Sequence, residues 1–63
     1  MAAFDELKKE VQKLMNQGRD FDVAFSEGFD IVRQRIAEYE DLADKADELL
    51  KLKHRIRLQI NQI

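Results

Sequence analysis

The sequence predicts an all-α protein, a helical hairpin in which a short helix over residues 3–17 precedes a long helix over residues 21–62. Two observations support this prediction. The 63-residue chain contains no proline and only two glycines, Gly18 and Gly28, so few of its residues interrupt a helix. Apolar side chains also return at spacings of three and four along nearly the whole chain, which is the pattern of one helix face.

The first predicted helix has the charge distribution and the ending that helices favour. Asp5 and Glu6 fall in its first turn, beside the positive end of the helix dipole, and lysines follow later. Gly18 comes after its last turn, where the left-handed conformation that ends many helices favours glycine. Its apolar face consists of Phe4, Leu7, Val11 and Leu14.

The second predicted helix begins after Asp20, whose side chain can accept a hydrogen bond from the first turn. Ser26 is a competing cap, and a helix beginning there would leave a break near Gly28. A continuous helix is favoured, because only then do four apolar side chains share one face. These are Phe21, Phe25, Phe29 and Val32. Tolerating Gly28 inside the helix costs about 1 kcal/mol.

Residues 50–60 also fit a β-strand, because apolar and polar side chains largely alternate there. A single strand would have no second strand to pair with in this chain. Leucine, lysine, arginine and glutamine, which dominate the stretch, are good helix formers. We therefore interpret residues 50–60 as helix.

The long helix would carry more apolar surface than the short helix could cover. At about 1.5 Å per residue, the two helices would measure about 64 Å and about 22 Å. We expect a hairpin core in which the short helix packs along the first part of the long one. Its residues are Phe4, Leu7, Val11, Leu14, Phe21, Phe25, Phe29, Val32 and Ile36.

Beyond the hairpin, apolar residues recur every seven positions, as they do in a coiled coil. An apolar strip of this length normally marks an interface, so we expect a second copy to cover it. The prediction is a homo-oligomer, either an antiparallel coiled-coil-like dimer or a four-helix bundle. The predicted interface residues are Tyr39, Leu42, Ala46, Leu49, Ile56, Ile60 and Ile63.

The charge pattern predicts the antiparallel orientation. Acidic residues dominate positions 38–48, basic residues dominate positions 51–57, and no acid occurs after Glu48. Parallel copies would bring like charges together, whereas antiparallel copies would set acid against base.

The composition limits the class of protein. Residues 1–63 form one small domain at most, and without cysteine the remaining support for so small a core is oligomerisation. With 44% hydrophobic and 38% charged residues, the chain is too apolar for disorder and too charged for a membrane span. No signal-peptide pattern opens the sequence, so we expect a cytoplasmic protein with no membrane partner.

Residues that could carry chemistry are few. His54 is the only histidine, and Ser26 is the only serine in a chain without threonine or cysteine. No spacing in the sequence supplies a nucleophile with a base, a set of metal ligands or a glycine-rich phosphate loop. We therefore expect no enzymatic activity, no catalytic or metal-binding residue and no cofactor.

We expect instead a protein–protein interaction module, an adaptor, inhibitor or scaffold that self-associates and binds a second protein. The alternative is a small nucleic-acid-binding regulator. Its phosphate contacts would be Lys51, Lys53, Arg55 and Arg57. The net charge of −2 gives no general attraction to nucleic acid, and an acidic block precedes this stretch, so nucleic acid stays the alternative.

Overall fold

The computed structural model describes residues 3–61 of the chain and confirms the all-α class. It contains four helices, and no strand occurs among the described residues. The helices are α1 (Ala3–Asn16), α2 (Phe21–Arg33), α3 (Ala37–Leu42) and α4 (Ala46–Ile60).

Helices α1 and α2 form the predicted hairpin. Gly18 ends α1 with a φ of 103°, and its N–H donates to the carbonyl of Met15 at 3.0 Å. The Asp20 carboxylate then caps α2 by accepting a hydrogen bond from the Val23 N–H at 2.9 Å. Helix α2 runs without interruption through Gly28, which confirms the continuous interpretation at that residue.

Gly28 lies at a close approach of α1 and α2. A Cβ atom added there would lie 3.2 Å from Val11 Cγ2 and 3.4 Å from the Val11 backbone nitrogen. The residue is buried, so its helix-weakening effect is offset by the close packing that it permits.

The predicted long helix over residues 21–62 is interrupted after Arg33: two turns separate three helices between Phe21 and Ile60. Ile36 adopts an extended conformation (φ −123°, ψ 109°), and Lys45 leaves the helical region as well (φ −111°, ψ 85°). The turns keep hydrogen bonds: the Ile36 N–H donates to the Val32 carbonyl at 3.0 Å, and the Lys45 N–H donates to the Leu42 carbonyl at 2.9 Å.

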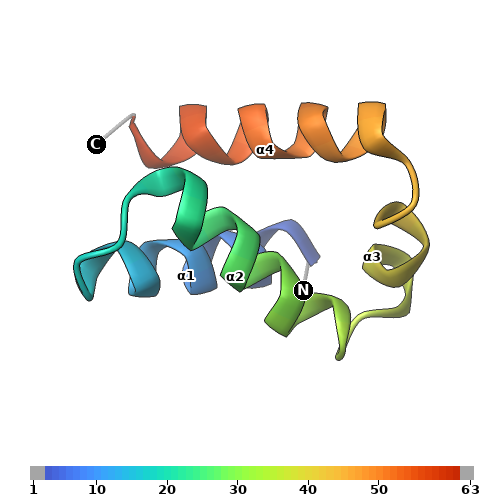
Figure 1. Ribbon diagram of the computed structural model, residues 1–63, viewed down its shortest axis with the longest axis horizontal. Coiled ribbons are helices and arrows are strands. Elements are labelled where there is room, and N and C mark those ends of the chain that lie inside the picture. Colours follow the sequence, from blue (N-terminus) through green and yellow to red (C-terminus); the bar gives the residue numbers. More distant parts are fainter. Residues whose placement is uncertain (1–2, 62–63) are drawn as a thin grey trace.

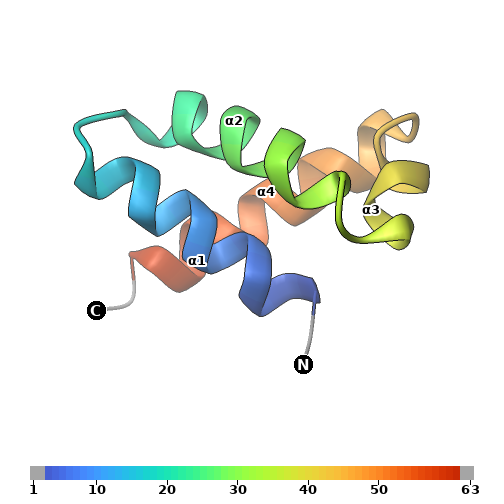
Figure 2. The same ribbon diagram turned by 90° about the horizontal axis from the view of Figure 1, so that it is seen from below.

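The physical reason for the two turns is burial. In a straight helix the apolar residues of the last third of the chain would face water, whereas the turns bring them back onto the hairpin. Figure 1 shows α4 lying along one side of the α1–α2 hairpin, with α3 at one end as the connection. Figure 2 shows that α4 crosses behind α1 at an angle.

The core is assembled from all four helices. Helix α4 contributes Leu52, Ile56 and Ile60, and Ile56 is fully buried. The other buried apolar residues are Leu7, Val11, Leu14, Ala24, Phe25, Phe29, Val32 and Tyr39. Six of the nine predicted hairpin-core residues are therefore buried, and the other three, Phe4, Phe21 and Ile36, are half-buried against them.

The residues predicted as an oligomer interface lie mostly inside this single-chain core. Tyr39, Ile56 and Ile60 are buried in it, and Leu42 and Leu49 are half-buried against it. Ala46 is exposed, and Ile63 lies outside the described residues. The seven-residue repeat therefore follows the inner faces of α3 and α4, which pack against the chain's own hairpin.

An unbroken row of aromatic rings links α2 to α3. Neighbouring ring centroids are 6.1 Å apart for Phe21–Phe25, 6.0 Å for Phe25–Phe29 and 5.7 Å for Phe29–Tyr39. These spacings suit favourable offset or tilted aromatic contacts. Burial raises the pKa of the Tyr39 phenol, the Glu38 carboxylate adds to the rise, and Arg55 opposes it.

We predict that Gly28→Val lowers the free energy of unfolding by about 1–3 kcal/mol, because its side chain would overpack against Val11. The matched control is Ser26→Val, an exposed position on the same helix, for which we expect a change below about 0.5 kcal/mol. Urea unfolding followed by circular dichroism measures both. Equal stability of the two variants would contradict the close approach of α1 and α2.

We also predict that Tyr39 makes stability fall at high pH. The unfolded phenol has the ordinary pKa of 10.0 and the folded phenol a higher one, so the unfolded chain loses its proton first. The stability that the protonated Tyr39 phenol contributes is fully present below pH 10 and is lost as pH rises through the pKa of the folded chain. As pH rises above 10.0, stability should fall more steeply for the natural chain than for Tyr39→Phe. Parallel curves would show that Tyr39 is not buried.

Candidate interaction surface

The side of α4 that points away from the core carries two exposed leucines. Leu50 is 65% exposed and Leu58 is 49% exposed, and His54 lies between them at spacings of four. On an ideal helix these three side chains fall within about 80° of one another, opposite the buried line that contains Ile56. We call the exposed residues Leu50, Lys51, His54, Arg55, Arg57 and Leu58 the outward face of α4.

Aromatic rings of the hairpin support the cations on and beside this face. The Arg57 guanidinium lies 4.9 Å from the Phe21 ring centroid, and the Arg55 guanidinium lies 4.8 Å from that of Phe4. Cation–π contacts of this kind hold a charged group at the surface while its aliphatic stem covers apolar area.

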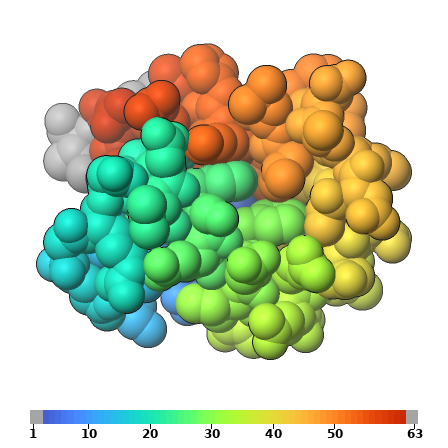
Figure 3. Space-filling model, viewed as in Figure 1, coloured from blue at the N-terminus to red at the C-terminus, as the bar shows by residue number. Residues whose placement is uncertain are grey.

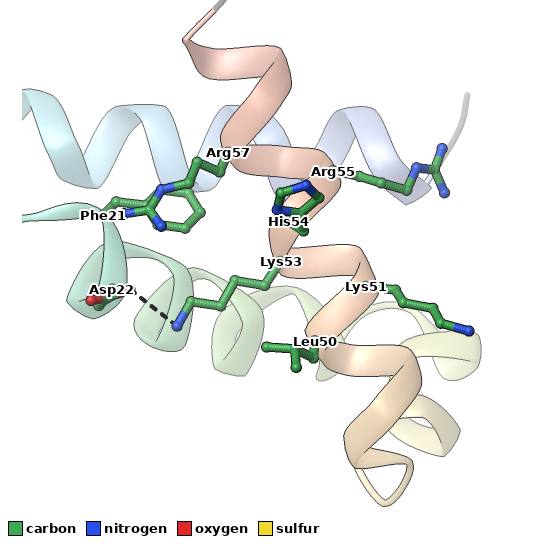
Figure 4. A pocket seen from close by; sticks show the side chains of 8 residues that line it. All are labelled: Phe21, Asp22, Leu50, Lys51, Lys53, His54, Arg55 and Arg57. Carbon is green, nitrogen blue, oxygen red and sulfur yellow. Dashed lines mark ion pairs between the residues drawn. The ribbon is translucent and has the colours of Figure 1, made fainter.

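Lys53 lies at the edge of the outward face and connects α4 to α2. Its Nζ is 3.1 Å from the Asp22 carboxylate and 5.9 Å from the Phe25 ring centroid. Figure 4 shows Lys51 and Arg55 pointing to one side of α4, Lys53 and Arg57 reaching toward α2, and His54 between the two pairs.

A shallow groove lies between the start of α2 and the outward face. Phe21 and Asp22 line it from α2, and the α4 side is lined by Leu50, Lys51, Lys53, His54, Arg55 and Arg57. Its volume is about 720 Å³. The space-filling view shows the end of α4 and the start of α2 in contact as one surface (Figure 3). The groove therefore combines two apolar side chains with a strongly cationic lining.

The opposite charge gathers at the other end of the molecule. Glu38 and Asp41 are exposed on α3, Asp44 in the turn after it and Asp47 at the start of α4, and we call these four residues the acidic end. No ion pair within residues 3–61 includes any of them. Nearby acids are paired, since Glu40 contacts Arg33 at 3.2 Å and Glu48 contacts Lys51 at 3.8 Å.

The structure places all four predicted nucleic-acid contacts on α4, but these side chains differ in exposure and in ion pairing. Lys51, Arg55 and Arg57 are exposed, whereas Lys53 is half-buried and paired with Asp22. Ser26 and His54 lie exposed on different helices. Within residues 3–61, no three histidine, cysteine, aspartate or glutamate side chains cluster in a way that could hold a metal ion.

The exposure of Leu50 and Leu58 is the feature that sequence reasoning missed. Both leucines fall outside the seven-residue series that contains Leu49 and Ile56, but so does the buried Leu52, so the series alone does not reveal which leucines are exposed. No helix in the described part of the chain is both long and apolar enough to cross a membrane.

Comparison of the chain with protein-family models, with curated proteins and with solved structures finds no match.

Proposed function

We propose that this protein is a non-enzymatic protein-interaction module that self-associates, and that the outward face of α4 is its contact surface. The observation that carries the proposal is the pair of leucines, Leu50 and Leu58, exposed two turns apart on one helix face. Large apolar side chains that line up on the surface of a small domain favour an interface.

The way the cations are held supports binding. Arg55 and Arg57 rest on Phe4 and Phe21, so less side-chain freedom remains to be lost when a partner docks. The partner that fits such a face has apolar side chains surrounded by carboxylates, because opposite charges direct association and fix orientation.

The placement of the chemistry-bearing residues supports a binding role over a catalytic one. Catalysis by Ser26 would need a base within hydrogen-bond reach, and His54 lies exposed on another helix. The Tyr39 phenol, whose pKa burial raises, is in the core and does not line the groove.

Nucleic-acid binding is the second candidate. It is favoured because α4 has no acidic residue after Glu48, and Lys51, Arg55 and Arg57 are exposed together in that part of the helix. Phosphate binding of this kind weakens steeply with salt. The pairing of Lys53 with Asp22 and the two leucines among the cations fit a protein partner better.

We predict that Leu50→Gln together with Leu58→Gln weakens self-association at least tenfold. Removing apolar contact from two leucines on each copy costs about 1–3 kcal/mol, and about 1.4 kcal/mol corresponds to a factor of ten. Sedimentation equilibrium over a range of concentrations gives the dissociation constant, and circular dichroism checks that the helices are retained.

The matched control is Val23→Gln together with Ile31→Gln. Val23 and Ile31 are 43% and 41% exposed on α2, also eight residues apart, so they reproduce the spacing on a different face. We expect the control to stay within twofold of the natural chain. A natural chain that remains monomeric at high micromolar concentration, or equal weakening by both variants, would overturn the proposal.

A further inference from the structure

Acid and base occupy different parts of α4 and of the turn that precedes it. Asp44 lies in that turn, Asp47 lies in the first turn of α4, and His54 and Arg57 follow later on the same helix. All four side chains are exposed. No ion pair within residues 3–61 includes them, so the two carboxylates and the Arg57 guanidinium have no oppositely charged partner in that part of the chain.

From this arrangement we infer that the groove between α2 and α4 receives the acidic turn, Asp44 to Asp47, of a second copy. This inference rests on the proposed function and specifies its partner and register. The two α4 helices lie antiparallel about a two-fold axis between Leu50 and Lys51. The contact is then isologous, so each copy gives its acidic turn and receives that of the other.

The register follows from positions along the helix. Asp47 and His54 are equally far from the proposed axis, so Asp47 faces His54 of the second copy. Arg57 extends past the first residue of the second copy's α4, toward the turn that holds Asp44 of that copy. Each pair occurs twice in the dimer because the axis repeats it.

The same register covers the exposed leucines. Leu50 lies beside the two-fold axis, so it packs against the same part of α4 in the second copy. Leu58 also extends past the start of the second copy's α4, toward the turn between α3 and α4 that begins at the half-buried Ala43. Apolar burial then supplies the attraction, and the charges select the orientation.

Two other arrangements bring like charges together. Parallel helices set Asp47 against Asp47 and Arg57 against Arg57. An antiparallel pair centred on His54 sets Lys51 of one copy against Arg57 of the other. Like charges that face each other across an interface oppose association, so both are disfavoured.

The first test uses charge reversal. One variant carries Asp44→Lys and Asp47→Lys, and the other carries His54→Glu and Arg57→Glu. Each variant alone removes the complementary side chains from both pairs and sets like charges at positions 44 and 57, so we expect each to self-associate at least about tenfold more weakly than the natural chain. In an equimolar mixture, the introduced lysines of one variant face the introduced glutamates of the other, and the unchanged residues keep their natural partners. We expect a heterodimer whose dissociation constant is within about threefold of that of the natural dimer.

Failure of the inference is distinguishable from failure of the proposed function. If the natural chain does not self-associate, both are overturned. If the natural chain self-associates and the Leu50→Gln, Leu58→Gln variant does so more weakly, the proposed function stands. If an equimolar mixture of the charge-reversed variants then associates as weakly as each variant alone, only the proposed register is overturned.

The second test traps the orientation covalently and does not depend on the folding of charge-reversed variants. The natural chain has no cysteine, so Asp47→Cys and His54→Cys each introduce a single thiol at an exposed position. A disulfide needs Cα atoms within about 7 Å, so it reports residues that face each other. Under mild oxidation we expect the mixture to yield a heterodimer in which the Asp47→Cys chain is linked to the His54→Cys chain. Predominant linkage of Asp47→Cys to itself would overturn the antiparallel arrangement.

Discussion

The packing of α4 against the α1–α2 hairpin is the interaction on which the rest of the structure depends. Ile56 is fully buried and stands between Leu52 and Ile60 on the inner face of a 15-residue helix. A helix of this length is marginal by itself in water, so its stability comes from this contact. Burying one such side chain contributes about 1.5–3 kcal/mol. The inner face holds α4 in place, and the outward face stays exposed to solvent.

The hairpin was predictable because local chemistry determines it. Gly18 supplies the left-handed residue, Asp20 supplies the cap, and the apolar spacing continues through Gly28. The two later turns were not predictable in this way. Ile36 and Lys45 begin α3 and α4 without a side-chain cap, and no glycine or proline lies nearby, so burial of distant residues decides the conformation.

A weaker signal for those turns was present in the acidic block. Glu38 and Glu40 fall in the first turn of α3, and Asp47 and Glu48 fall in the first turn of α4, where carboxylates favour the positive end of the helix dipole. Sequence reasoning interpreted these acids as one acidic block that orients a second copy. It also assigned the apolar repeat to a second copy, because periodicity marks a buried face without saying which chain covers it. The exposed Leu50 and Leu58 emerge only once α4 is folded back.

The most direct test of this account is whether α4 folds back within one chain. Arg55 lies 4.8 Å from the Phe4 ring in the folded chain, whereas a straight helix would carry it about 28 Å beyond Ile36. Isotope-filtered nuclear Overhauser spectroscopy on mixed labelled and unlabelled protein separates contacts within a chain from contacts between chains. The account predicts Phe4–Arg55 contacts within one chain. Their absence, or their appearance only between differently labelled copies, would contradict it.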